Sequence, residues 1–231
     1  MESIDKLEGT FAKTRSEEAG PTAVSRAVVG RLPRYHRYLR MLIESGCGRI
    51  SSSALSALMG LSASQVRQDF NCFGGFGQQG YGYNVKYLYG EIGDLLGVNE
   101  GYRAVILGAG NLGRALAGTH MFERRGVTRL CLFDCDAALV GRSIYGLPVY
   151  DVATLEDFCR TERVDLAVMA TPPEAAPALA ERLAAAGVKG ILNFANTELT
   201  DVGGCLVENV HLSDPLMKLC YDMKHREEGG K

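Results

Sequence analysis

The 231-residue chain lacks several features that would assign it to a large class of proteins. It has no run of 18 apolar residues, so no membrane-spanning helix is expected. It opens on a charged segment without an apolar core, so we expect no signal peptide and a cytoplasmic protein. None of its seven cysteines forms a Cys-x-x-Cys pair, and Cys131-x3-Cys135 has no second ligand pair nearby. We therefore expect reduced thiols and no metal site, although a redox role for a cysteine stays open.

Charge is unevenly distributed along the chain, although the formal net charge is only −2. Residues 1–20 carry three basic and five acidic side chains without periodicity, and we expect a disordered tail. Residues 21–98 carry eight basic and four acidic side chains, whereas residues 99–231 carry fourteen and eighteen. The positive charge of the 21–98 segment is what an anion-binding module needs.

The most informative motif is a glycine-rich turn between an apolar run and a helical pattern. Residues 104–107 are typical of a buried parallel strand, and G-x-G-x-x-G follows them directly. This turn consists of Gly108, Ala109, Gly110, Asn111, Leu112 and Gly113. The first glycine permits a tight turn, the second lets the backbone approach a pyrophosphate, and the third allows close packing of helix and strand. The free N–H groups of the following helix favour the phosphate charge.

A carboxylate follows the second apolar run at the spacing typical of dinucleotide-binding folds. Asp134 lies 21 residues after Gly113, where it can accept hydrogen bonds from both hydroxyls of an adenosine ribose. The same carboxylate would repel a 2′-phosphate, so NAD(H) is favoured over NADP(H). A glycine-rich turn that only packs a helix is one alternative. Coenzyme A is another, but Asp134 suits a free ribose diol better than a phosphorylated ribose.

Two later turns are placed to contact the same ligand. The apolar runs before Thr171-Pro172 and before Asn193-Phe194 indicate buried strands. Ligands of open α/β sheets bind beyond the carboxyl ends of the strands, so these residues are expected beside the nicotinamide. Ordinary turn chemistry is the alternative. A pocket lined by Pro172, Phe194 and the Ala195 backbone would penalise burial of the cationic, oxidised nicotinamide only.

The 21–98 segment contains a helix-turn-helix pattern. Residues 21–50 are typical of helix, and residues 51–53 then offer N-caps for a helix that ends at Met59. Gly60 allows a turn, and Ser62 caps a second helix that runs to about residue 71. Four apolar side chains should pack the two helices together: Leu55, Leu58, Leu61 and Val66. Four side chains of the second helix should stay exposed to contact bases and phosphates: Ser64, Gln65, Arg67 and Gln68. Any small helical hairpin is the alternative.

A glycine-rich hairpin follows the helix-turn-helix. Residues 73–83 hold five glycines with aromatic residues between them, which predicts the wing of a winged helix. Further DNA contacts are expected from the first helices and the wing: Arg31, Arg34, Ser52, Gln78, Gln79 and Tyr81. A helix over residues 84–96 and a linker over residues 97–101 lead to the glycine-rich turn.

These patterns predict an α/β protein with three ordered parts after the tail. They are a winged helix-turn-helix domain over residues 21–98, a Rossmann-like NAD(H)-binding domain over residues 99–212, and a C-terminal helix over residues 213–231. The apolar stripe of this helix comprises Leu216, Leu219, Cys220 and Met223. It has no later partner in its own chain, so we expect it to pack on a second subunit.

With a winged helix before an NAD-type fold, the chain resembles the bacterial redox-sensing transcriptional repressors called Rex over roughly residues 22–225. Besides the glycine turn, the resemblance rests on residues 31–33 with Tyr35 and Arg37, residues 50–52, 65–70, 73–74, 80–85 and 187–195. It implies a homodimer that binds inverted-repeat operator DNA and exchanges its C-terminal helices. It further implies that NADH releases the DNA and that NAD+ permits binding. No membrane and no further protein partner are inferred.

Three features depart from the pattern of many Rex proteins. Gln68 replaces a second basic residue in the recognition helix, and Gln78-Gln79 replace basic residues of the wing. Both changes weaken attraction to phosphates. Many members also have an Asp that is thought to pair with the Arg of the RLP motif. His211 stands at the matching position, which leaves the partner of Arg31 open.

An oxidoreductase with a helical N-terminal domain is the alternative function. Catalysis would need a proton donor at the nicotinamide, and His120 and His211 are the histidines of the nucleotide-binding half. No substrate domain is visible, because one nucleotide fold uses the available residues. We therefore expect a repressor without catalytic residues.

Overall fold

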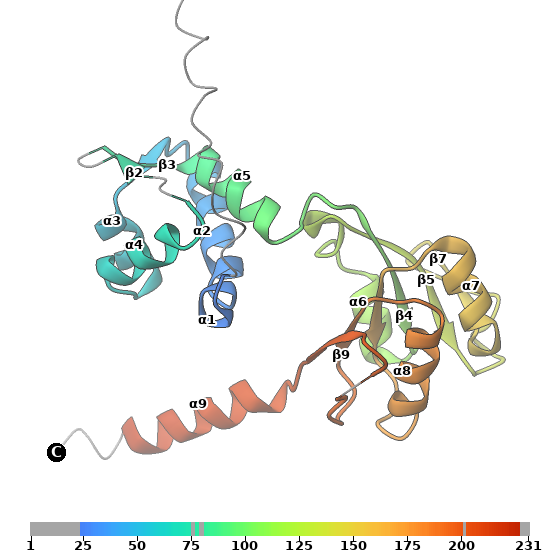
Figure 1. The fold of residues 1–231 in the computed structure, drawn as a ribbon. Coiled ribbons are helices and arrows are strands. Elements are labelled where there is room, and N and C mark those ends of the chain that lie inside the picture. The colour runs from blue at the N-terminus through green and yellow to red at the C-terminus, as the bar shows by residue number, and fades with distance from the viewer. Residues whose placement is uncertain (1–23, 75–76, 79–80, 201, 227–231) are drawn as a thin grey trace, which may run out of the picture. The chain divides into compact units, whose positions relative to one another are not determined.

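The computed structural model describes residues 24–74, 77–78, 81–200 and 202–226. The expected tail over residues 1–20 lies outside these ranges. The chain divides into two compact units, Met1–Leu96 and Gly97–Lys231, and each is described by itself (Figure 1). Within the described ranges, no helix combines the length and apolar character needed to cross a membrane.

The N-terminal unit combines short helices with a small antiparallel sheet. Its helices are α1 (Arg26–Val29), α2 (Leu32–Glu44), α3 (Ser52–Met59), α4 (Ala63–Asn71) and α5 (Val85–Leu95). Its strands are β1 (Arg49–Ile50), β2 (Gly77–Gln78) and β3 (Gly82–Asn84). The central strand β3 pairs antiparallel with both β1 and β2. The predicted helix-turn-helix and β-hairpin wing are confirmed, whereas the helical prediction is wrong at residues 49–50, which pair with β3.

Side-chain caps fix the start of both helices of the helix-turn-helix. The Oγ atom of Ser51 accepts a hydrogen bond from the Ala54 amide at 3.1 Å. The Oγ atom of Ser62 accepts one from the Gln65 amide, also at 3.1 Å. Between the helices, Gly60 ends α3 with a φ of +64°, a conformation that costs glycine little. The caps and the turn lie where the sequence predicted them.

The apolar core of the N-terminal unit lies between α2, α3, α4 and α5. Leu55 and Val66 are fully buried and Leu61 is partly buried, as predicted, but Leu58 is 49% exposed. The buried face of α3 is set by Leu55 and Met59, which are four residues apart and therefore one above the other. Leu58 falls beside that face, so its predicted packing role is wrong.

The second unit is built on a seven-stranded sheet. Its strands are β4 (Tyr102–Leu107), β5 (Val127–Asp134), β6 (Ser143–Ile144), β7 (Leu147–Asp151), β8 (Leu166–Met169), β9 (Gly190–Asn193) and β10 (Leu206–Asn209). Its helices are α6 (Asn111–Ala117), α7 (Leu155–Glu162), α8 (Ala176–Ala185) and α9 (Ser213–Arg226), with 3-10 turns at Glu123–Arg125 and Val152–Thr154. The spatial order is β10-β9-β8-β4-β5-β7-β6, and β6 alone pairs antiparallel.

This order identifies the fold and the position of its ligand site. Without β6, the strands follow the order 3-2-1-4-5-6 of a dinucleotide-binding sheet. The direction of winding reverses between β4 and β8, which are hydrogen-bonded neighbours. The crevice beyond the carboxyl ends of these two strands is therefore the expected binding position. The predicted Rossmann-like fold is confirmed.

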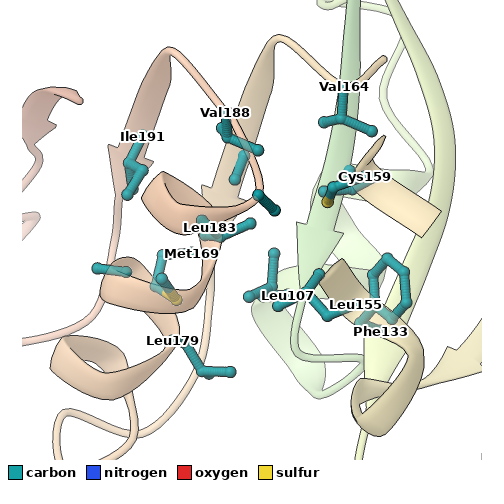
Figure 2. Close-up of a cluster of buried hydrophobic side chains, with 14 of the residues drawn as sticks. Leu107, Phe133, Leu155, Cys159, Val164, Met169, Leu179, Leu183, Val188 and Ile191 are labelled. Atoms are coloured by element: carbon teal, nitrogen blue, oxygen red, sulfur yellow. The ribbon is translucent and has the colours of Figure 1, made fainter. Parts of the chain in front are cut away.

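Alternate residues of the central strands point to opposite faces of the sheet. Leu107 packs with Leu155 of α7 and Leu183 of α8, in the cluster drawn in Figure 2. Ile106 packs on the other face with Leu116 of α6. Helices thus cover both faces, which explains why the strands are continuously apolar.

None of the residues of α9 is buried in this single chain. Leu216 is 61% exposed, Leu219 is 55% exposed and Met223 is 63% exposed. Met217 and Tyr221 add exposed apolar surface at neighbouring positions around the same helix. A helix with this much exposed apolar surface is typical of an interaction site.

Candidate functional site

The glycine turn lies at the switch point between β4 and β8. A Cβ atom on Gly108, whose φ is +96°, would lie 2.4 Å from the Ala170 carbonyl oxygen. A Cβ atom on Gly113 would lie 1.8 Å from the Gly108 carbonyl oxygen. Gly110 differs, because its φ of −72° suits any residue and no atom lies within 4 Å of its Cβ position. Two glycines are therefore required for packing, while the second glycine of the motif faces open space.

Asp134 holds the glycine turn from the end of β5. Its Oδ2 atom accepts a hydrogen bond from the Ala109 amide at 2.7 Å, and its Oδ1 atom accepts one from the Asp136 amide at 2.9 Å. Each carboxylate oxygen has a second lone pair, and the residue is partly exposed. The carboxylate is thus held in place and can still accept hydrogen bonds from two hydroxyl groups.

Thr171 follows β8, and its backbone lies next to Gly108 of the glycine turn that follows β4. Its Oγ1 atom is buried and has no hydrogen-bond partner in the part of the chain that the structure describes. A buried hydroxyl without a partner costs about 1–3 kcal/mol, which a polar ligand atom would recover. Phe194 packs from the end of β9 against the apolar cluster that contains Ala109, whereas Pro172 is exposed. The residues present therefore fit a nucleotide with a polar group near Thr171.

Asn193 has a different position from its neighbours. It is fully buried, and its Nδ2 atom donates to the Thr197 carbonyl and to Asn209 Oδ1, both at 2.8 Å. Its Oδ1 atom accepts a hydrogen bond from the Ala195 amide at 3.0 Å. In this structure Asn193 shapes the turn that carries Phe194 and does not face the crevice.

The recognition helix α4 exposes Ser64, Arg67 and Gln68 to solvent. The Arg67 Nη1 atom donates to Ser52 Oγ at 3.2 Å, which connects α4 with the start of α3. Burial raises the pKa of Tyr83 in the wing strand β3, and the charge of Arg67 opposes this rise. Arg67 therefore lies near both α3 and the wing.

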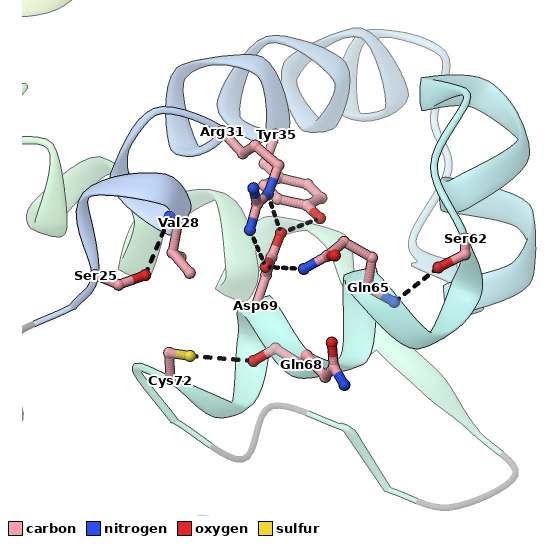
Figure 3. Close-up of polar contacts among 9 residues, drawn as sticks. All are labelled: Ser25, Val28, Arg31, Tyr35, Ser62, Gln65, Gln68, Asp69 and Cys72. Carbon is pink, nitrogen blue, oxygen red and sulfur yellow. Dashed lines mark hydrogen bonds and ion pairs between the residues drawn. The ribbon is translucent and has the colours of Figure 1, made fainter.

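Three other predicted DNA-contact residues have partners inside the domain. The Gln65 amide donates to Asp69 Oδ1 at 2.8 Å, and the Arg31 guanidinium forms two hydrogen bonds with the Asp69 carboxylate. Figure 3 shows both side chains pointing to Asp69. The Arg34 Nη2 atom donates to the Met59 carbonyl. These contacts restrict all three side chains.

The wing is held against β1. Arg49 donates from Nη1 to the Tyr81 carbonyl at 3.0 Å, and the Tyr81 residue is 72% exposed. A Cβ atom on Gly82 would lie 2.7 Å from the Ile50 carbonyl oxygen, so the two strands approach closely at a glycine. The predicted contacts of residues 78–79 involve side chains outside the described part of the structure.

Two side chains that shape these sites were not predicted. Asp69 lies on the face of α4 that also carries the buried Val66 and Phe70. A charge on such an apolar face could have signalled a buried ion pair. Arg114 donates from Nε to the Ala109 carbonyl at 2.8 Å and so braces the glycine turn. No sequence pattern indicates that contact, because it depends on how the turn folds back.

The structure also gives His211 a partner. Its Nε2 atom lies 2.9 Å from Glu198 Oε1, in the loop between β9 and β10. Arg31 is paired with Asp69 of its own domain. Within the single chain, His211 and Arg31 therefore each lie beside a different carboxylate and do not pair with one another.

Each of the two units is similar to a known family of protein domains. A model of a putative DNA-binding protein N-terminus matches residues 23–71, and a model of a CoA binding domain matches residues 99–197. The redox-sensing transcriptional repressor Rex of Clostridium tetani (strain Massachusetts / E88) is 46% identical over 205 residues, which are 89% of this chain and 97% of that protein.

Solved structures agree with this match. The crystal structure of RSP in complex with beta-NAD+ and operator DNA has a TM-score of 0.84 at 46% identity, covering 89% of this chain and 95% of that chain. The crystal structure of RSP in complex with beta-NADH has a TM-score of 0.82 at 43% identity, covering 89% and 97%.

A winged helix-turn-helix domain followed by a nucleotide-binding α/β domain defines a ligand-responsive transcriptional regulator. The sequence identity to the Clostridium tetani protein and the share of both chains that it covers show that the chain belongs to the Rex family of redox-sensing transcriptional repressors. The relatives are repressors and not enzymes, so the oxidoreductase interpretation is set aside.

Proposed function

We propose that this chain binds NAD(H) on its glycine turn and that the redox form of the bound cofactor controls its affinity for inverted-repeat operator DNA. RSP was solved with beta-NAD+ and operator DNA, and separately with beta-NADH. Two observations support the proposal: the open space over Gly110, and the buried Thr171 hydroxyl, which has no hydrogen-bond partner among the described residues. NADH releases the operator and NAD+ permits binding.

The six residues of the glycine turn hold the cofactor by its phosphates. The free N–H groups at the start of α6 face the pyrophosphate, and Asp134 accepts the hydroxyls of the adenosine ribose. Thr171, Pro172 and Phe194 lie beside the nicotinamide, and Asn193 supports their side of the crevice from within. The cofactor is a ligand here, and its redox state is the signal.

Discrimination between the two redox states follows from desolvation. The oxidised nicotinamide is a cation and the reduced one is neutral, so an apolar surface at Phe194 and Ala195 penalises the oxidised form. Phe194 is partly buried in an apolar cluster and Ala195 is buried. A ligand shifts a conformational equilibrium only by its difference in affinity for the two states.

DNA recognition uses the exposed face of α4 and the wing. Ser64, Arg67 and Gln68 enter a major groove, Ser52 holds Arg67, and Tyr81 lies along the backbone with the neighbouring wing residues. A homodimer places two copies of α4 on half-sites separated by whole helical turns. The apolar surface of α9 packs on the partner subunit. A cytoplasmic location suits a protein that binds the chromosome.

Calorimetry with three ligands tests the cofactor assignment. The full-length protein should bind NADH most tightly, NAD+ more weakly, and coenzyme A least. Because the matching family model is described by coenzyme A, that ligand is the appropriate competitor. Tightest binding of coenzyme A would contradict the assignment.

A further inference from the structure

A buried carboxylate lies in the recognition helix. Asp69 is 1% exposed, although its neighbours Arg67 and Gln68 on the same helix α4 are exposed. Arg31 donates to it from Nε at 2.7 Å and from Nη2 at 2.6 Å. Tyr35 Oη donates at 2.8 Å, and Gln65 Nε2 donates at 2.8 Å. Figure 3 shows the three donors converging on the carboxylate from two helices.

The charges of this cluster are balanced. Burial of the carboxyl opposes its ionisation, but the hydrogen bonds from Arg31, Gln65 and Tyr35 outweigh burial and lower the pKa of Asp69. Asp69 is therefore an anion at neutral pH, and the guanidinium beside it keeps its positive charge. Fork-to-fork pairing of this kind fixes orientation as well as charge. The pair is thus a rigid and neutral unit that joins α2 to α4.

The pairing decides which side chains are available to DNA. The Arg31 side chain is 28% exposed, and its positive charge is cancelled by a carboxylate in contact with it. Gln65 occupies a position one turn before Asp69, and its amide donor is committed to the same oxygen atom that Arg31 meets. A guanidinium and an amide are the groups that recognise guanine and adenine, and both are turned inward here.

We propose that Asp69 is a positioning residue that sets operator specificity by keeping Arg31 and Gln65 off the DNA. The reading face of α4 then consists of Ser64, Arg67 and Gln68. Arg67, which is exposed and held by a neutral hydroxyl, keeps its full charge for DNA. This inference rests on the proposed binding of operator DNA.

Salt dependence separates this role from a merely structural one. Each phosphate contact made by a cation contributes about −0.9 to the slope of log affinity against log salt. Arg31→Gln should leave the slope unchanged even if it weakens binding, because Arg31 does not hold a phosphate. A decrease of about 0.9 per protomer in the magnitude of this slope would overturn the proposal. Where Arg31→Gln alone fails to fold because it leaves Asp69 unpaired, the double variant Asp69→Asn with Arg31→Gln removes both charges and should also keep the slope of the unmodified protein.

Asp69→Asn should increase the salt dependence of DNA binding. It releases the Arg31 cation beside the recognition helix, so the slope should steepen and affinity for scrambled duplex should rise. The ratio of operator to scrambled affinity should fall about tenfold, the size of one mismatched base pair. The double variant Asp69→Asn with Arg31→Gln should restore the slope. A folded Asp69→Asn protein with the slope and ratio of the unmodified protein would contradict the proposal.

Gln65 provides a matched test on the same helix. Gln65→Met preserves length but removes the amide, and it should leave base preference unchanged at every operator position. Gln68→Met is the control and should relax one position. The probe is the duplex that the unmodified protein selects from a random pool. If the unmodified protein selects no sequence, the proposed function fails, whereas relaxed preference in Gln65→Met overturns only the role of Asp69.

Discussion

The Ala109 amide and the Asp134 carboxylate are joined by a 2.7 Å hydrogen bond. Parallel pairing aligns Leu107 of β4 with Phe133 of β5, so the turn after one strand meets the carboxylate that ends the other. The group that would accept the ribose hydroxyls therefore also fixes the turn that would hold the pyrophosphate. One preformed unit can recognise both parts of an adenosine diphosphate, which reduces the ordering needed on binding.

Asp134→Ala should weaken NADH binding by about 1.5–3 kcal/mol, because hydrogen bonds to a charged acceptor are lost and the Ala109 turn is released. Calorimetry gives the affinity directly. Asp134→Ser should in addition admit NADPH, since the repulsion of a 2′-phosphate is removed. NADH affinity unchanged in Asp134→Ala would remove the ribose assignment.

Gly110→Val should abolish the response to NADH while leaving the fold and operator binding intact. Its backbone has an ordinary φ, and its Cβ position is empty, so the side chain fills only the space of the pyrophosphate. The variant should repress constitutively.

Gly113→Ala is the matched control for Gly110→Val. Its Cβ would collide with the Gly108 carbonyl, so it should lower the thermal stability of the nucleotide unit. If NADH still released Gly110→Val from the operator, the phosphates would have to bind elsewhere.

Arg67→Ala tests the recognition helix. If the guanidinium reads a guanine edge, the loss should be about 1–3 kcal/mol and one operator position should relax. If it holds a phosphate, the loss should be uniform across sequences, and the salt slope should fall by about one unit per protomer. Arg160→Ala is the control, because that arginine is exposed in the other unit and pairs with Asp157. A variant with unaltered affinity and slope would exclude both roles of Arg67.

Local signals predicted much of the fold. The caps Ser51 and Ser62, the turn at Gly60 and the glycine motif each depend on a few neighbouring residues, so the sequence alone located them. The error at Leu58 arose because Leu58 and Met59 both lie one turn after Leu55, so the pattern of this short helix does not define which of them faces the core. Short strands such as β1 have no periodicity of their own and form because a partner strand is present.

Contacts between distant residues could not be predicted in the same way. Arg31 and Gln65 are polar residues on helices, and their sequence neighbourhood favours a DNA contact. Their common partner Asp69 is 38 residues from Arg31, and only the packing of α2 on α4 brings them together. Asn193 was expected in the crevice because it ends a strand, but the return of β10 supplies Asn209 as its partner.

The C-terminal helix should hold the dimer together. Deletion of residues 213–231 should give a monomer or a loosened dimer with poor operator affinity, whatever the cofactor. Leu219→Asp is a gentler variant that places a charge on an apolar side chain exposed by 55% in the single chain. It should also weaken the dimer, measured by sedimentation at micromolar protein. A truncated protein that stayed dimeric and still released operator with NADH would show that α9 neither holds the dimer together nor connects cofactor binding to operator binding.

The central claim is that the bound redox form of the cofactor controls operator binding. Its most direct test follows the fluorescence anisotropy of a labelled inverted-repeat operator bound to the full-length protein during titration with NADH, and then during back-titration with NAD+. The account predicts that NADH releases the operator and that excess NAD+ restores the complex, with both responses absent in Gly110→Val. Release by neither nucleotide, or equal release by both, would contradict it.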